Sequence, residues 1–466
     1  MLPLQRIMYS FKRYKNQYRA NLKLALPVIL AQLGQILVQF ADNVMVGRYG
    51  GEDPLPLAAV SFGSSVAFML FIAGIGVAMG LTPIVGELYA QGNRRASSNY
   101  LHNGVVFYTL LGVLLMALQF AFEPLLYHMG QPEAVVDMSI PYYRTLALSL
   151  PFVMLFGAFK QFLEGVGNTS IVMVIVLISN LLNVFLNWIF IYGALGAPEF
   201  GVLGAGIATL IARMVTPFML IAYFMRHRTY KVYMRGFCLS NISLRSIRRL
   251  VQIGLPIAAQ MFLESSAFVG TGIMMGWFDE IAISANQIVT TMANSAFMIV
   301  MSIGAATTIL ASHSYGSRDV ENLSRAVHAS YHLGLVWNAF AAIMFILLRN
   351  YIPMLFTENQ EVIALTADLL IFVALFQLSD GVQNISIGTL RGIQDVKIIT
   401  PIAFLAYIVL NLPVGYLFGF KLGMGPEGLI LGFTFGLTIA GVLAMIRIKH
   451  TMKILRKRFA TISSDL

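Results

Sequence analysis

Three carboxylate side chains lie deep inside long apolar stretches of this 466-residue sequence: Asp42, Glu264 and Asp380, whereas Asp368 lies nearer the end of its stretch. An ionised group at the centre of a bilayer costs at least about 2.5–3.5 kcal/mol, so an acid usually remains there because it faces a cavity or has a function. Two carboxylates with amide and hydroxyl oxygens nearby can coordinate a hard cation such as sodium. Two close carboxylates can instead share a proton, because desolvation and like charge both favour the neutral form. The spacing of these residues leaves both chemistries open.

Amide side chains accompany Asp42 in the N-terminal half. Three glutamines precede it at intervals of three and four residues, which places them on one face of a helix: Gln32, Gln35 and Gln39. The fifth apolar stretch repeats these intervals with Asn180, Asn183 and Asn187. Such stripes either join neighbouring helices by hydrogen bonds or line a polar cavity. We predict a binding site from Asp42, Gln39, Asn183 and Asn187, with simple interhelical bonding as the alternative for the asparagines.

Each acid of the C-terminal half has a neighbour one helical turn away. Gln260 precedes Glu264 by four residues, and Phe376 precedes Asp380 by the same interval. Further polar side chains close to Asp380 are Ser379, Gln383 and Asn384. We predict that Glu264 and Asp380 form a cation site, with Na⁺ as its metal or a proton in its place. Gln260 and Phe376 would lie beside that site.

Membrane-spanning helices must position these side chains. Hydrophobic residues make up 58% of the chain and charged residues only 11%, whereas a soluble domain carries roughly 25% charged residues. A spanning helix needs about 20 mostly apolar residues. Twelve stretches meet this condition: 22–47, 57–82, 100–122, 138–160, 169–194, 201–225, 250–275, 282–312, 327–349, 361–388, 398–420 and 427–448. The sequence therefore predicts an all-α membrane protein with twelve transmembrane helices.

Basic residues concentrate in every second link between these stretches. The N-terminal arm, the central link 226–249 and the tail 449–466 are rich in lysine and arginine, while the alternate links are richer in acid. Because basic links stay in the cytoplasm, we expect both termini there, in a plasma membrane that is the inner membrane if the source is Gram-negative. The net charge of +10 lies in short links, so no nucleic-acid partner is expected. The single cysteine, Cys238, excludes an intramolecular disulfide framework.

The two halves of the chain repeat one another. Five features recur at separations of 224 to 229 residues: Pro27 and Pro256, Gly92 and Gly316, Gly165 and Gly392, Asn183 and Asn411, Pro198 and Pro426. Six helices in each half make both halves enter the membrane from the same side, which is a parallel repeat. We predict an N-lobe at 1–225, a cytoplasmic linker at 226–249, a C-lobe at 250–448 and a cytoplasmic tail at 449–466.

Several motifs, in order along the chain, carry a family resemblance: Ala25-Leu26-Pro27, Asp42 to Gly47, Gln91-Gly92, Leu163-Glu164-Gly165, Asn183 to Gly193, Gly201 to Thr209, and Leu390-Arg391-Gly392 with Asp395. They resemble the multidrug and toxic compound extrusion transporters, and within them the NorM-type branch. The likeness covers nearly the whole chain, from about residue 21 to residue 448. Each motif is modest alone, but their order and the helix count make the set fairly specific.

The resemblance implies a V-shaped pair of six-helix lobes that exports cationic, amphipathic compounds by Na⁺ or H⁺ antiport through alternating access. By position, it implies an N-lobe site lined by Asp42, Asn183, Asn187 and Thr209. It also implies that Glu264 and Asp380 form the C-lobe cation site. One departure concerns Phe376, because the branch often has a tyrosine there. A phenyl ring offers a cation–π face but no hydroxyl ligand.

Two other functions are alternatives to export. A flippase for lipid-linked oligosaccharide precursors, from the same superfamily, is the alternative, but it would carry cations in its cavity, where this chain has mainly acids and only Arg213. A membrane enzyme would need a His-rich or Ser/His/Asp cluster within the spans, and most histidines fall in links or near helix ends. We therefore expect no enzymatic activity, no cofactor, and a monomer whose partners are small organic cations, a monovalent coupling ion and the lipid bilayer.

Overall fold

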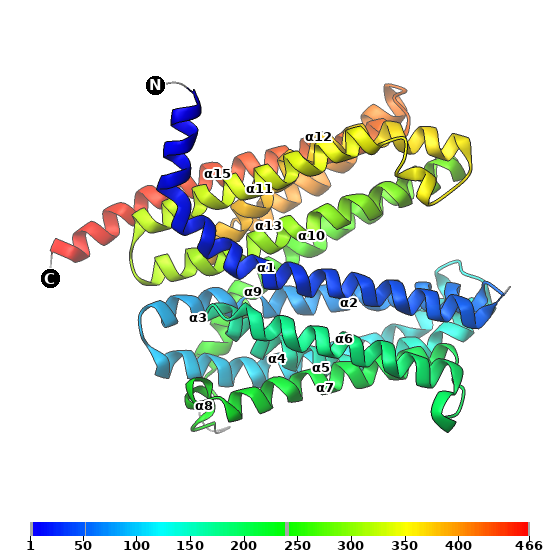
Figure 1. Ribbon diagram of the computed structural model, residues 1–466, viewed down its shortest axis with the longest axis horizontal. Coiled ribbons are helices and arrows are strands. Elements are labelled where there is room, and N and C mark those ends of the chain that lie inside the picture. Colours follow the sequence, from blue (N-terminus) through cyan, green and yellow to red (C-terminus); the bar gives the residue numbers. More distant parts are fainter. Residues whose placement is uncertain (1–2, 52, 238–241, 465–466) are drawn as a thin grey trace. The chain divides into compact units, whose positions relative to one another are not determined.

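The computed structural model of the chain describes residues 3–51, 53–237 and 242–464 (Figure 1). Cys238 lies outside these residues. Within them, all regular elements are helical, and twelve helices are long and apolar enough to cross a membrane. The predicted fold class, an all-α membrane protein with twelve spans, is confirmed.

The helices form two compact units. The N-terminal unit contains Pro27–Ala258, and the C-terminal unit contains Met1–Leu26 with Ala259–Leu466. The unit boundaries fall inside two long helices, α1 (Pro3–Gly50) and α9 (Leu244–Met275), and each boundary lies close to the proline of that helix, Pro27 or Pro256. Proline removes one helical hydrogen bond and weakens the helix locally. The repeated Leu-Pro pair therefore marks the two places where the chain passes between units, while the predicted linker at 226–249 remains a prediction.

The N-terminal unit is organised around its longest complete helix. After the end of α1 it contains, in order, α2 (Leu55–Ala78), α3 (Leu81–Ala90), α4 (Arg94–Phe122), η1 (Glu123–His128), α5 (Glu133–Gly165), α6 (Thr169–Tyr192), η2 (Ala194–Gly196), α7 (Val202–Arg226) and α8 (Arg228–Met234). Helix α5 packs against α2, α4 and α7, and α6 packs on α7.

The C-terminal unit repeats this plan. After the end of α9 it contains α10 (Glu280–Gly316), α11 (Val320–Leu348), η4 (Pro353–Leu355), α12 (Gln360–Gly392), α13 (Ile399–Ala403), η5 (Phe404–Asn411), α14 (Leu412–Tyr416), η6 (Leu417–Lys421) and α15 (Pro426–Ser464). Helix α12 packs against α10, α11 and α15, and it has the same length as α5, 33 residues. The span at 399–421 is interrupted by two π-helical segments, η5 and η6.

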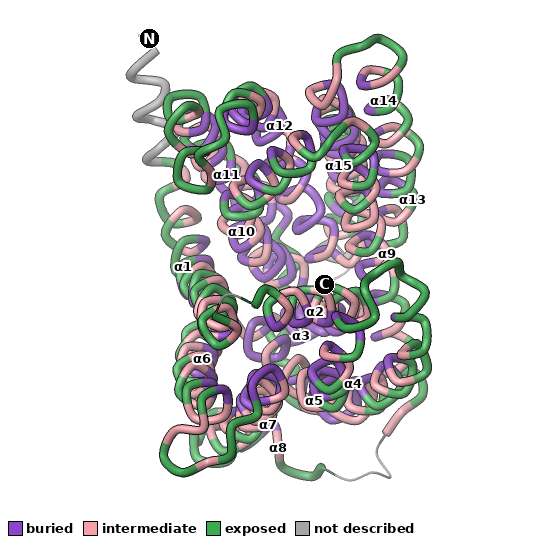
Figure 2. The backbone as a smooth tube through the Cα atoms, turned by 90° about the vertical axis from the view of Figure 1, so that its right-hand side faces the viewer, coloured by how far each residue is buried: buried purple, intermediate pink, exposed green. Residues whose placement is uncertain are grey.

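The helices at the centre of each unit are more buried than the others (Figure 2). More than half of the most apolar window is buried in α5, α10 and α12, but less than a third in α1, α4, α6 and α11. The outer helices keep large apolar side chains exposed, among them Leu37, Leu181 and Val336. Side chains of this kind suit a hydrocarbon solvent, and the helices satisfy their own backbone hydrogen bonds there. The protein is a multi-pass membrane protein.

The repeated glycines at 165 and 392 have the same structural role. A Cβ atom on Gly165 would lie 2.9 Å from the carbonyl oxygen of Thr82, and one on Gly392 would lie 2.7 Å from that of Thr308. Both distances are shorter than van der Waals contact, so only glycine lets the ends of α5 and α12 approach their neighbours this closely. Small residues serve this purpose in membrane helix packing.

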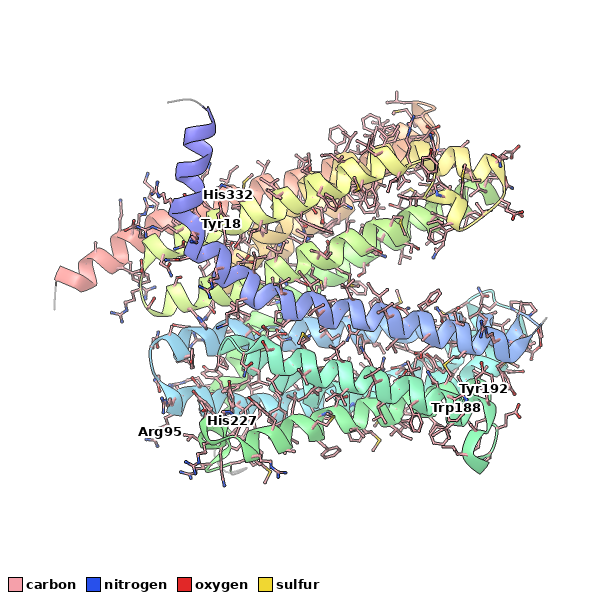
Figure 3. All side chains as sticks on the ribbon, viewed as in Figure 1. Tyr18, Arg95, Trp188, Tyr192, His227 and His332 are labelled. Atoms are coloured by element: carbon pink, nitrogen blue, oxygen red, sulfur yellow. The ribbon has the colours of Figure 1, made fainter. Side chains whose placement is uncertain are left out.

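The two ends of the N-terminal unit differ in chemistry (Figure 3). Trp188 and Tyr192 lie toward one end of α6, and Arg95 and His227 lie at the opposite end of the unit. Amphipathic rings favour the membrane interface, and basic residues favour the cytoplasmic side. This arrangement agrees with the alternation of acidic and basic links in the sequence.

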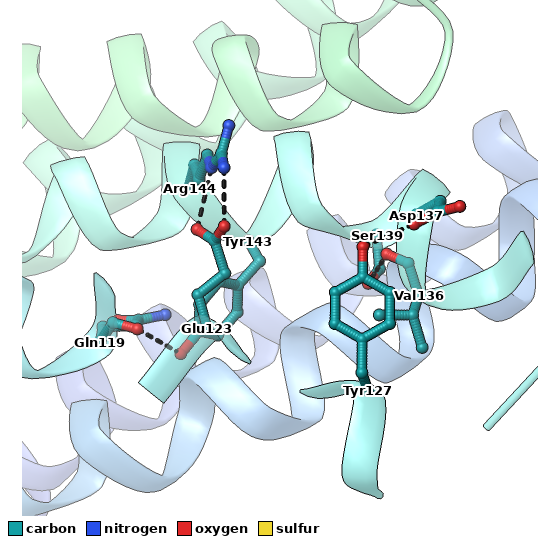
Figure 4. A network of polar contacts seen from close by, with 8 residues as sticks. All are labelled: Gln119, Glu123, Tyr127, Val136, Asp137, Ser139, Tyr143 and Arg144. Atoms are coloured by element: carbon teal, nitrogen blue, oxygen red, sulfur yellow. Dashed lines mark hydrogen bonds and ion pairs between the residues drawn. The ribbon is translucent and has the colours of Figure 1, made fainter. Parts of the chain in front are cut away.

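Polar contacts fasten the end of α4 to α5 (Figure 4). Arg144 donates to both carboxylate oxygens of Glu123, at 2.9 and 2.6 Å. The Tyr143 hydroxyl donates to the carbonyl oxygen of Gln119 at 2.9 Å, and the Tyr127 hydroxyl donates to Asp137 at 2.6 Å. These bonds close the turn through η1.

The first part of α1 is bound to the C-terminal unit. Asn21 is fully buried and donates to the Ser330 hydroxyl at 2.9 Å. The Tyr18 hydroxyl and Nδ1 of His332 are 2.6 Å apart (Figure 3). These contacts with α11 explain why residues before Leu26 belong to the C-terminal unit although they come first in the chain.

Candidate functional site

Four of the five residues predicted for the N-lobe site form one hydrogen-bonded chain. Asn187 donates to Oδ1 of Asp42 and also to Oδ1 of Asn183, the latter at 3.3 Å. Asn183 in turn donates to the Thr209 hydroxyl at 3.2 Å. The chain crosses three helices, α1, α6 and α7. The asparagines are buried and Asp42 is half-buried, so the acid has an ordered amide partner in the spanning region.

Gln39, the fifth residue, lies apart from this chain. Its side chain is exposed, and in the part of the protein that the structure describes no hydrogen bond joins it to Asp42 or the asparagines. Gln39 is only three residues from Asp42, but Asp42 is the one that is hydrogen-bonded to Asn187 of α6. The role of Gln39 as a site residue remains a prediction.

Arg213 lies on α7, one turn beyond Thr209. Its guanidinium donates to the Ser149 hydroxyl at 2.9 Å and stands 5.2 Å from the centre of the Phe71 ring. It also interacts electrostatically with Asp42, although among the described residues no ion pair joins the two. The N-terminal unit therefore holds a cation close to its acid, through contacts that sequence spacing did not reveal.

The C-terminal unit holds a longer network around Glu264. Gln260 donates to Oε2 of Glu264 at 2.8 Å, and the Tyr407 hydroxyl donates to Oε1 at 2.9 Å. Gln383 donates to the Tyr407 hydroxyl at 2.7 Å, and Arg391 donates to Oε1 of Gln260 at 2.6 Å. Both oxygens of Glu264 are therefore bound, and the network joins α9, α12 and η5.

Asp380 has a different environment. Its side chain is 4% exposed, and Oδ1 accepts a hydrogen bond from Asn384 at 3.1 Å. Oδ2 is buried and has no hydrogen-bond partner among the described residues. Asp380 also interacts electrostatically with Glu264. A buried carboxylate oxygen without a donor is a position where a cation or a proton would be strongly favoured.

Phe376 lies one turn before Asp380 and is buried beside another ring. Its ring centre is 6.0 Å from that of Phe433. Both rings line a cavity of about 10 Å³, with Thr271, Asn286 and Thr290 as its polar members. A space of this size holds about one water molecule. The hydroxyl that Phe376 cannot supply is present instead on Tyr407, which binds Glu264.

The side chains around Glu264 and Asp380 include carboxylate, amide and hydroxyl groups, whose oxygens could bind a cation. Within the described ranges there is no group of three or more His, Cys, Asp and Glu side chains that could hold a metal ion. The available oxygens are two carboxylates with amide and hydroxyl groups, which is a ligand set for a weakly held hard cation.

Arg391 and Tyr407 are site residues that sequence reasoning missed. The predicted span 361–388 stops before Arg391 and so left it in a link, but Arg391 lies in the last turn of α12 and its side chain reaches Gln260. Tyr407 was one tyrosine in an apolar run. The internal repeat contained a signal, because an offset of 228 residues places Tyr407 opposite Ser179, beside the asparagine stripe of α6.

Comparison with known proteins gives one consistent family. The MatE family model matches residues 27–189 and again residues 256–417, so the two matches begin 229 residues apart, as the internal repeat predicts. The multidrug resistance protein NorM of Vibrio cholerae is 32% identical over 436 residues, which cover 92% of this chain and 95% of that protein.

Solved structures agree in fold. An outward-facing multidrug resistance MATE family transporter of the MOP superfamily gives a TM-score of 0.85 at 21% identity, over 95% of this chain and 97% of that one. A MOP superfamily transporter from Pyrococcus furiosus gives 0.86 at 20% identity, over 94% and 97%. With two family-model matches, a full-length relative and this fold, the chain belongs to the MatE family, the multidrug and toxic compound extrusion transporters, in the branch of the NorM proteins.

Proposed function

We propose that this protein is a secondary active exporter that moves cationic, amphipathic compounds out of the cell in exchange for inward Na⁺ or H⁺. The observation that carries the proposal is Asp380, a buried carboxylate in the spanning region whose Oδ2 has no hydrogen-bond partner among the described residues and which is close enough to Glu264 to feel its charge. Buried acids in membrane spans usually serve ion pathways. The full-length relatives named multidrug resistance protein NorM supply the substrate class.

The two units provide separate acidic centres for the two kinds of cargo. Asp42, bound by Asn187, offers a negative charge for an organic cation in the N-terminal unit. Glu264 and Asp380 offer a place for the coupling ion in the C-terminal unit. Export would follow if ion entry at one centre favours a state that releases the drug at the other, through alternating access of the repeated halves.

Arg213 supports export over the flipping of lipid-linked sugars. A pyrophosphate carrier needs free cationic groups in its cavity, but the Arg213 guanidinium already binds Ser149 and lies over Phe71. Asp42 close by would also repel an anionic head group.

The decisive experiment is dye efflux from proteoliposomes with Na⁺ and proton gradients imposed one at a time. We expect Glu264→Gln and Asp380→Asn to reduce gradient-driven efflux to the level of protein-free liposomes while the protein still inserts. Asp368→Asn is the matched control, because Asp368 lies on the same helix as Asp380 with 62% of its side chain exposed. Wild-type efflux by both amide variants would refute the proposal. Asp42→Asn should also lower efflux, and its failure to do so would confine coupling to the C-terminal unit.

We further propose a plasma-membrane location, a monomeric protein and cytoplasmic termini. The basic end of the N-terminal unit, with Arg95 and His227, supports this orientation (Figure 3). Fusions of green fluorescent protein and of alkaline phosphatase to the C-terminus test it, since only the first should be active.

A further inference from the structure

Arg391 is a half-buried cation placed two hydrogen bonds away from Glu264. It lies in the last turn of α12, and its Nη2 donates to Oε1 of Gln260 at 2.6 Å. Gln260, 2% exposed, donates from Nε2 to Glu264 at 2.8 Å. Nε of Arg391 is buried and has no hydrogen-bond partner within the described part of the chain. The guanidinium is therefore hydrogen-bonded to Gln260, and the chain from Arg391 through Gln260 to Glu264 is called the relay below.

The chemistry of the three groups fixes the direction of the relay. A guanidinium can only donate hydrogen bonds and a carboxylate can only accept them. The Gln260 amide between them must therefore turn its oxygen to Arg391 and its nitrogen to Glu264, and a flipped amide would lose both bonds. Tyr407 donates to the other oxygen of Glu264. Arg391 thus holds the Glu264 carboxylate in one orientation from a distance.

Arg391 also places a permanent positive charge near the cation site, since arginine does not lose its proton in proteins. We propose that Arg391 is a positioning residue that orients Glu264 through Gln260. By its charge, Arg391 also keeps the affinity for the cation low enough for release in each transport cycle. A transported ion must bind well enough to enter and weakly enough to be released. This inference rests on the proposed function and adds a residue to it.

The charge effect has a sign opposite to that of structural damage. If two unit charges are separated by about 7 Å in a medium of effective dielectric constant about 20, Coulomb's law gives a change in cation affinity of about fiftyfold. Water reaching the half-buried Glu264 raises the effective dielectric constant, and at a value of about 35 the change is about tenfold. Removal of the charge should therefore tighten cation binding and slow release. A residue that only caps α12 would, when lost, weaken binding or leave it unchanged.

The test is the cation dependence of dye efflux in proteoliposomes, with Na⁺ and protons varied separately. For Arg391→Gln we expect the half-saturating concentration of the driving cation to fall about tenfold, together with the maximal rate. Arg391→Lys should return both values toward wild type. Arg447→Gln is the control, because it removes another arginine of the same unit that is bound to Asp395 and outside the relay. It should leave the half-saturating concentration unchanged.

Gln260→Leu provides a second, independent variant. It cuts the relay but leaves the charge of Arg391, so the half-saturating cation concentration should rise where Arg391→Gln lowers it. Unchanged or weaker cation binding in Arg391→Gln, or shifts in the same direction in both variants, would overturn the inference. If Arg391→Gln does not fold, an unchanged cation dependence in Gln260→Leu overturns it alone. Loss of efflux in Glu264→Gln with no shift in either variant would leave the proposed function standing, whereas cation-driven efflux by Glu264→Gln would contradict that function itself.

Discussion

Asp395 fixes the link after α12, and the effect of removing its charge on stability can be calculated. Asp395 accepts hydrogen bonds from Nε and Nη2 of Arg447 at 2.7 and 3.0 Å, and from the Thr451 hydroxyl at 2.8 Å. Burial alone would raise the pKa of Asp395, but these hydrogen bonds and the charge of Arg447 outweigh it and lower that pKa below its ordinary value. These contacts join the link to α15, and Asp395→Asn removes the negative charge of the carboxylate that accepts them.

We expect Asp395→Asn to lower the free energy of unfolding of the C-terminal unit by about 2 kcal/mol at neutral pH. A hydrogen bond to a charged group contributes about 1.5–3 kcal/mol when buried. The Arg447 side chain is 39% exposed, so water screens the pair and the sum is well below three full bonds. Because the folded-state pKa is lowered, the stabilisation is present above the unfolded pKa of about 3.9 and is lost as the pH falls through the folded value. The difference between wild type and variant should therefore shrink in acid.

The assay is unfolding in mixed micelles with increasing denaturing detergent, at pH 7.5 and again in acid, followed by tryptophan fluorescence. Arg447→Gln and the double variant complete a double-mutant cycle. The double variant should be little less stable than either single variant, because both remove one ion pair. A difference between Asp395→Asn and wild type that does not change with pH, or additive losses in the cycle, would refute the reasoning.

Two further predictions use the same unfolding assay. A methyl group on Gly388 would collide with the backbone of Gly304 where α12 crosses α10, so Gly388→Ala should lower the free energy of unfolding by about 1–3 kcal/mol. The control is Gly157→Ala, whose Cβ would have an ordinary contact at 3.5 Å and which should be nearly neutral. Equal losses of stability in the two variants would contradict the packing argument. Arg144→Gln should leave the unfolding midpoint unchanged, because the exposed Arg144 pair with Glu123 (Figure 4) is screened by water; a clear loss would show that this pair is shielded by lipid or protein.

The sequence alone determined that this protein lies in a lipid bilayer and that its two halves repeat one another. Twelve apolar stretches with few charges have one physical solution, because helices are the local way to satisfy backbone hydrogen bonds in a bilayer. The spacing of Asn183 and Asn187 placed both on one face of a helix, and the offset between Gly165 and Gly392 marked two equivalent packing points. These conclusions depend on contacts between residues close in sequence, or on copies of one pattern.

Only the tertiary structure decided which polar groups meet. Gln39 and Asp42 share one helix, yet only Asp42 meets Asn187, which is 145 residues away. The bonds from Arg391 to Gln260 and from Tyr407 to Glu264 span 131 and 143 residues. No periodicity encodes such contacts, because they depend on the rotation of each helix about its axis when it packs on its neighbours. Hydropathy left Arg391 in a link, and helix packing brought its long side chain to Gln260, which is hydrogen-bonded to Glu264.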